Sequence, residues 1–113
     1  MKIKGTNISM TRGDSEAIKV AVKDTLGNVI PLVTGDTIYF TVRETMLNKT
    51  KIIEKIITEF DDGKALITID PQDTNDLNFV SYVYDIQLTK ENGTVKTIIT
   101  PSRFMITGEV TYD

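Results

Sequence analysis

Residues branched at the β-carbon dominate this chain and constrain its fold more than any other feature. Of 113 residues, 15 are Ile, 9 are Val and 17 are Thr, whereas Ala is rare. Their stiff χ1 rotamers suit the pleated surface of a sheet better than a helix. A chain of this length has room for one domain with one hydrophobic core. We therefore expect a single all-β domain over residues 1–113.

Apolar and polar residues alternate along short segments, which is the pattern of half-buried strands. The segments are 7–11, 18–23, 38–43, 65–69, 82–88, 95–100 and 104–112. Glycine-containing turns separate many of them, and Pro31 predicts an edge or a bend at 29–33 because it cannot donate to a ladder. Asn92-Gly93 predicts a hairpin, and Pro101-Ser102 an interruption of its second strand. Seven or eight short antiparallel strands of this kind predict a β-sandwich.

The inward positions of these strands define a predicted core. Its members are Ile18, Val20, Val22, Phe40, Ile67, Tyr84, Ile86 and Phe104. Lys19 and Lys23 alternate with them and should face solvent.

Tyr82 and Tyr84 refine the predicted sandwich. In immunoglobulin-like domains, a tyrosine near the start of the corresponding strand hydrogen-bonds back to the preceding turn, two residues before an inward core position. Tyr82 and Tyr84 occupy those two places, which predicts an immunoglobulin-like β-sandwich. Two inward aromatic residues on a central strand explain the same pattern equally well.

The segment before these tyrosines predicts the chain's one helical turn, near residues 70–77. Asp70 is a suitable N-cap and Pro71 a suitable first helical residue. The three-residue spacing of Asp70, Asp73 and Asp76 would let their oxygens approach a calcium ion. A capped, solvated turn explains the same carboxylates without a metal, and the spacing is not that of an EF-hand loop. We therefore assign no metal and no cofactor.

The amino-acid inventory excludes much catalytic chemistry. The chain has no Cys and no His, which removes thiol nucleophiles, Ser-His triads and disulfides, and leaves no typical zinc site. A net charge of -3 disfavours nucleic acid as a partner. No apolar run suits a signal peptide or a membrane span. These features predict a protein that is not an enzyme and binds neither nucleic acid nor membrane.

The segment 51–60, KIIEKIITEF, carries apolar residues in both strand registers. Its spacing also fits a helix face, but its Ile content and the following Asp62-Gly63 turn favour a strand in a hairpin with 65–69. A strand with apolar residues on both sides should be covered on both sides. We therefore expect a subunit contact in a homo-oligomer, made by Ile52, Ile53, Ile56, Ile57 and Phe60. The alternative is a bulge that returns every Ile to one core.

Two further features suggest ligands but have simpler explanations. Arg12-Gly13-Asp14 spells an integrin-binding tripeptide, and the same residues form a turn for conformational reasons. Tyr39 on the polar face of a strand would suit a sugar ring only beside a second aromatic residue.

The turn and strand pattern as a whole resembles the N-terminal domain of phage baseplate upper proteins of Gram-positive siphophages and prophages. Its most specific pieces are the Leu-x-Thr-Gly-Asp stretch at 32–36 and the Tyr-x-Tyr-Asp-Ile-Gln-Leu strand at 82–88. The resemblance runs from about Ile8 to Val110. It departs at Ser81 and at 101–103, where relatives usually carry a glycine.

The resemblance implies an immunoglobulin-like domain that anchors receptor-binding parts of a tail through protein–protein association. Other tail or baseplate proteins would be its partners. It would be made in the bacterial cytoplasm and act in the virion. No catalytic residue comes with the family. A carbohydrate-binding or surface-adhesion module of immunoglobulin type remains the alternative.

Overall fold

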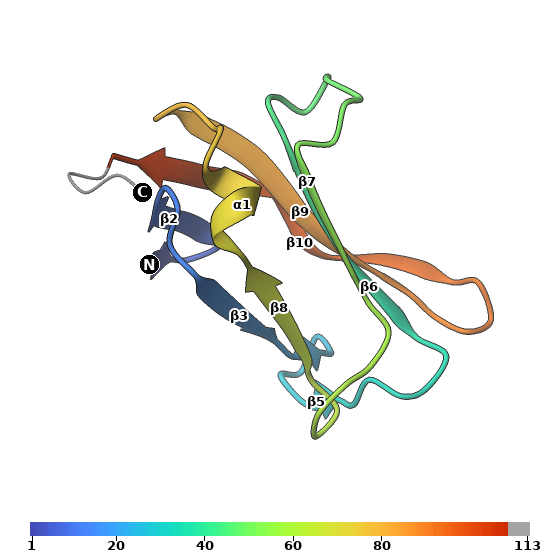
Figure 1. Ribbon diagram of the computed structural model, residues 1–113. Coiled ribbons are helices and arrows are strands. Elements are labelled where there is room, and N and C mark those ends of the chain that lie inside the picture. Colours follow the sequence, from blue (N-terminus) through green and yellow to red (C-terminus); the bar gives the residue numbers. More distant parts are fainter. Residues whose placement is uncertain (109–113) are drawn as a thin grey trace.

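The computed structural model describes residues 1–108, which form an all-β fold with one large sheet, two small sheets and a single turn of helix (Figure 1). The strands are β1 (Lys2–Lys4), β2 (Asn7–Thr11), β3 (Glu16–Val20), β4 (Val22–Lys23), β5 (Val29–Ile30), β6 (Thr37–Arg43), β7 (Ile53–Ile57), β8 (Ala65–Ile69), β9 (Ser81–Thr89) and β10 (Val95–Thr107). The helix α1 (Pro71–Thr74) joins β8 to β9. The predicted β-rich architecture is therefore confirmed.

The large sheet has the order β1-β2-β10-β9-β6-β7, and β3-β8 and β4-β5 form the small sheets. Its neighbours are antiparallel except β2 and β10, which run parallel with Phe104 opposite Ile8. The prediction of antiparallel strands alone is wrong at this pair. Because β2 and β10 come from opposite ends of the chain, no tight turn fixes their relative direction.

The strand β10 is also longer than predicted, since it continues through Pro101 and Ser102. Its register against β9 shifts between Thr97 and Ile99 and again between Ile99 and Ser102. Local irregularities of this kind accommodate a proline without ending the strand. Val110 and Tyr112, which were predicted to complete the sheet, lie outside the described residues.

The core lies between the large sheet and the β3-β8 pair. All eight predicted core residues are buried, and Lys19 and Lys23 are exposed as predicted. Phe40, Tyr84 and Phe104 form an aromatic cluster with ring centroids 5.4–6.2 Å apart. Rings at such distances pack favourably in tilted or edge-to-face arrangements. Three adjacent strands of the large sheet, β6, β9 and β10, are thus joined through their inner face.

The turn at Asp62-Gly63 forms as predicted, but the hairpin around it does not. Both residues have positive φ, and Asp61 and Lys64 exchange two backbone hydrogen bonds of 3.0 Å. Beyond this turn the strands separate, because β7 pairs with β6 in the large sheet and β8 pairs with β3. The chain between β7 and β8 crosses from one layer to the other. The turn residues alone therefore do not identify the strands that pair.

The capped helical turn predicted near residues 70–77 is confirmed as α1. Asp70 precedes the helix as its N-cap, and its backbone N–H donates to the Asp73 carboxylate at 2.7 Å. The Tyr82 hydroxyl accepts a hydrogen bond from the Asn78 backbone N–H at 3.0 Å. The phenol therefore ties the start of β9 to the turn before it.

Candidate interaction surfaces

The five residues of the predicted subunit contact lie on or beside β7, an edge strand of the large sheet. Ile53 is buried, and Ile52, Ile57 and Phe60 pack partly buried against the core. Ile56 points outward and is 54% exposed. The pairing of β7 with β6 is continuous from Ile53 to Ile57, so the bulge alternative is wrong within this strand. The apolar surface that remains for a partner on β7 itself is Ile56.

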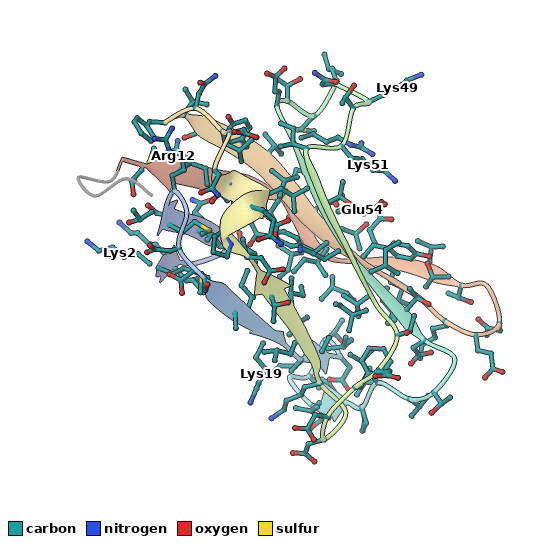
Figure 2. The ribbon with its side chains drawn as sticks, in the orientation of Figure 1. Lys2, Arg12, Lys19, Lys49, Lys51 and Glu54 are labelled. Carbon is teal, nitrogen blue, oxygen red and sulfur yellow. The ribbon has the colours of Figure 1, made fainter. Side chains whose placement is uncertain are left out.

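The loop between β6 and β7 carries two more exposed apolar side chains, Met46 (67%) and Leu47 (93%). Figure 2 shows this loop projecting beyond the sheets beside Lys49. At its end Lys51 pairs with Glu54 at 2.6 Å. The alternating strand patterns of the sequence do not identify this loop, because it lies between the strands. Two adjacent large apolar residues among turn-forming polar ones were the available signal.

The outer face of β6 and β9 is polar and slightly hollowed. Tyr39, Arg43, Asp85 and Gln87 help to line a shallow depression of about 260 Å³ there. Among residues 1–108 the Nε of Arg43 is buried without a hydrogen-bond partner. Within residues 1–108, the contacts between aromatic rings join Phe40, Tyr84 and Phe104. Tyr39 takes part in none of them.

The Arg12-Gly13-Asp14 turn is part of the protein's own packing. The Arg12 guanidinium lies 4.3 Å from the centroid of the Phe79 ring, within cation–π range. The Gly13 backbone N–H donates to the buried hydroxyl of Thr74 at 2.8 Å. The tripeptide therefore joins the β2–β3 turn to α1, which is the conformational explanation given above.

The three carboxylates near α1 do not gather around a common point. Lys55 Nζ lies 2.7 Å from Asp73 and 3.7 Å from Asp70, while Asp76 is exposed. Within the described chain, no three acidic side chains form a group that could hold a metal ion. Asp73 serves both the helix cap and the Lys55 ion pair.

No protein-family model matches the chain, and a search of curated proteins finds no match. No helix within residues 1–108 has the length and apolar character needed to cross a membrane.

Proposed function

We propose that this protein is a non-enzymatic structural component of a phage or prophage tail or baseplate. It acts by protein–protein association and anchors receptor-binding parts to the tail. The observation that carries the proposal is the exposed apolar surface of Met46 and Leu47 in the β6–β7 loop, together with Ile56 on β7. Large exposed apolar side chains on an edge strand and on the loop before it are candidate contacts with another protein.

The immunoglobulin-like character of the domain is part of the same proposal. It is supported by the two packed layers and by the hydrogen bond from the Asn78 N–H to the Tyr82 hydroxyl. That bond has the form of a tyrosine corner at the start of a central strand.

The residues behind the family resemblance have structural roles here. In the Leu-x-Thr-Gly-Asp stretch, the buried Asp36 accepts the Val33 N–H at 3.1 Å. Gly35 has a φ of +100°, and a β-carbon there would lie 2.8 Å from the side chain of Glu91. The stretch therefore forms a tight turn against the β9–β10 hairpin.

Tail particles from the phage or bacterium that encodes the chain provide the direct test. Antibodies against the purified domain, coupled to gold, should label the distal end of the tail in electron micrographs. An antibody against an unrelated cytoplasmic protein is the control. If the tails are unlabelled but the antibody reacts with the denatured proteins of the same preparation, the chain is present and its epitope is buried in the assembled tail. Absence of the chain from the denatured particles contradicts the proposal.

A carbohydrate-binding module is the second candidate, and the observation behind it is the polar depression on the outer face of β6 and β9. Tyr39, Asp85 and Gln87 supply one ring and polar groups there. The aromatic ring contacts within residues 1–108 do not include Tyr39, so a second ring does not lie beside it. A glycan array with the wild type and Tyr39→Ala separates the two functions. Strong retention that Tyr39→Ala abolishes would favour the module, whereas retention by neither protein favours the tail role.

A further inference from the structure

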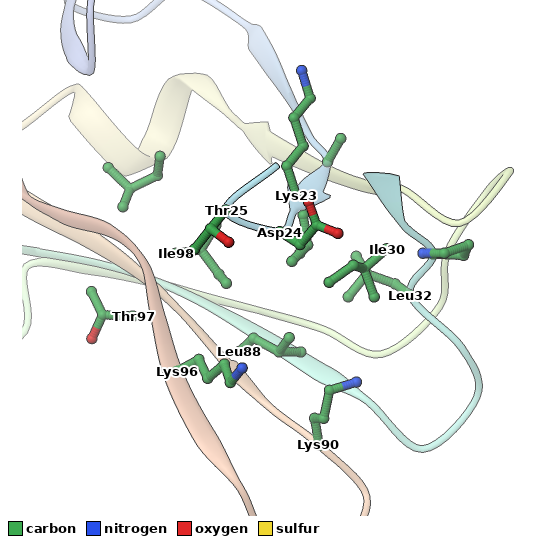
Figure 3. Close-up of a pocket in the computed structure, with 14 residues that line it drawn as sticks. Lys23, Asp24, Thr25, Ile30, Leu32, Leu88, Lys90, Lys96, Thr97 and Ile98 are labelled. Carbon is green, nitrogen blue, oxygen red and sulfur yellow. The ribbon is translucent and has the colours of Figure 1, made fainter. Parts of the chain in front are cut away.

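A groove separates the β4–β5 hairpin from the first half of β10 (Figure 3). Its volume of about 470 Å³ falls within the range of ligand-binding clefts, roughly 300–1,000 Å³. The lining is mainly apolar and includes Val22, Ile30, Leu32, Leu88 and Ile98. The strands β4 and β5 have two residues each, so the small sheet ends before it can cover this part of the large one.

The groove runs beside the first half of β10. Residues 96–99 line it consecutively, because the register shift between Thr97 and Ile99 interrupts the alternation of side chains there. On this side, β2 pairs with β10 only from Phe104 to Thr107. Within the described chain, residues 95–100 therefore have β9 as their one strand neighbour. The unpaired N–H and C=O groups of such an edge are a template for a further strand.

Positive charge lines the groove on a chain whose net charge is -3. Lys90 and Lys96 lie on either side of Leu88, and Lys23 is on the opposite rim with its ammonium directed outward (Figure 3). These three lysines form no ion pair with any residue from 1 to 108. The acidic residue in the lining, Asp24, accepts the N–H groups of its own turn at 2.9 Å. The groove is therefore complementary to an acidic partner.

We propose that this groove binds an extended acidic segment of a partner protein, which adds as a strand to residues 96–99 of β10. Apolar side chains of the segment pack on Ile30 and Ile98, and its carboxylates face Lys90 and Lys96. Main-chain hydrogen bonds supply affinity in this mode, and the side-chain pockets supply specificity. The register shift between Thr97 and Ile99 lies within this segment and limits the added strand to a few residues. The inference does not depend on the tail role, since any partner with such a segment would fit.

The probe is a capped hexapeptide in which Val and Glu alternate, titrated into the uniformly ¹⁵N-labelled chain and followed by amide chemical shifts. We expect shifts at residues 95–99 and at the β4–β5 hairpin. Lys96→Glu should weaken binding about five- to tenfold, because reversal replaces an attraction with a repulsion. Lys19→Glu is the matched control, since Lys19 is exposed on β3 outside the groove, and it should bind as the wild type does.

Three further measurements complete the test. A Val-Lys hexapeptide should bind more weakly than the Val-Glu peptide, and a Val-Glu peptide N-methylated at alternate amides should lose binding. The proposal is overturned if the Val-Lys peptide or the N-methylated peptide binds as tightly as the Val-Glu peptide. It is also overturned if the Val-Glu peptide shifts only amides on other surfaces. Light scattering on the free chain tests whether a second copy of the chain occupies the groove. A dimer that Lys96→Glu dissociates would also overturn the proposal. If Lys96→Glu melts early, Lys90→Glu replaces it.

Discussion

The two halves of β10 share one strand and one neighbour, β9, yet their surroundings differ. From Phe104 to Thr107 the strand pairs with β2, and Phe104 and Met105 pair with β9 as well; Phe104 and Ile106 are fully buried. From Val95 to Thr100 it has β9 alone, and its apolar residues are exposed or half-buried. Both halves contain β-branched or aromatic residues. A second neighbouring strand and a covering sheet therefore decide burial here, and residue type does not.

The largest expected effect contrasts the two halves directly. Phe104→Ala should lower the free energy of unfolding by about 3–5 kcal/mol, because lost transfer energy and a residual cavity add. Val95→Ala on the same strand should cost no more than about 0.5 kcal/mol, since Val95 is exposed. Urea unfolding followed by circular dichroism measures both. Similar losses for the two variants would show that the halves are equally packed.

The opposite edge of the large sheet offers the same contrast within β7. Ile53→Lys places a charge at a buried position and should destabilise the fold by about 2–4 kcal/mol. Ile56→Lys should leave the fold intact, because this side chain already faces outward.

Light scattering then tests the predicted subunit contact, which stays a prediction. If the wild type associates and folded Ile56→Lys is monomeric, Ile56 belongs to the contact. A wild type that is monomeric at high concentration contradicts it.

The strand segments were predictable because their determinants are local. Alternation placed Phe40, Ile67 and Ile86 in the core, and turn residues placed the breaks at Gly27 and Gly93. Strand partners were less predictable, since pairing depends on contacts distant in sequence. Neither the parallel β2–β10 pair nor the separation of β7 from β8 has a local signal.

The candidate surfaces were harder to predict for the same reason. Apolar residues in both registers of 51–60 predicted a subunit contact, which stays a prediction. The partial burial of Ile52 and Phe60 depends on the layer that covers them. The groove beside residues 96–99 arises from where β2 and β5 end, which the spacing of Lys90 and Lys96 does not reveal.

Tyr84 lies where the two halves of β10 meet, opposite Ser102, and its hydroxyl donates to the Thr6 carbonyl. Burial raises the pKa of Tyr84 above the usual tyrosine value of about 10. The unfolded chain therefore loses this proton at a lower pH than the folded chain. The stability that results is fully present below about pH 10 and is lost as pH rises through the folded pKa.

Urea unfolding at pH 8 and pH 11 measures this difference with Tyr84→Phe as the matched variant. The wild type should lose more stability than the variant over this interval, because only the wild type carries the Tyr84 phenol. The two proteins share every other titrating group. Equal losses would mean that the phenol ionises equally easily in both states.

The smallest expected effects concern two exposed lysines on the small sheets, Lys19 on β3 and Lys23 on β4. Lys19 and Lys23 alternate with Ile18, Val20 and Val22, and both lysines are exposed while the three apolar residues are buried. Lys19→Glu and Lys23→Glu should each change the free energy of unfolding by less than about 0.5 kcal/mol, since solvated surface charges contribute little. Thermal and urea unfolding at moderate salt measure both. A loss comparable to that of Phe104→Ala would place these lysines against the core, and because side chains alternate, a one-residue slip of register would be required to put them there.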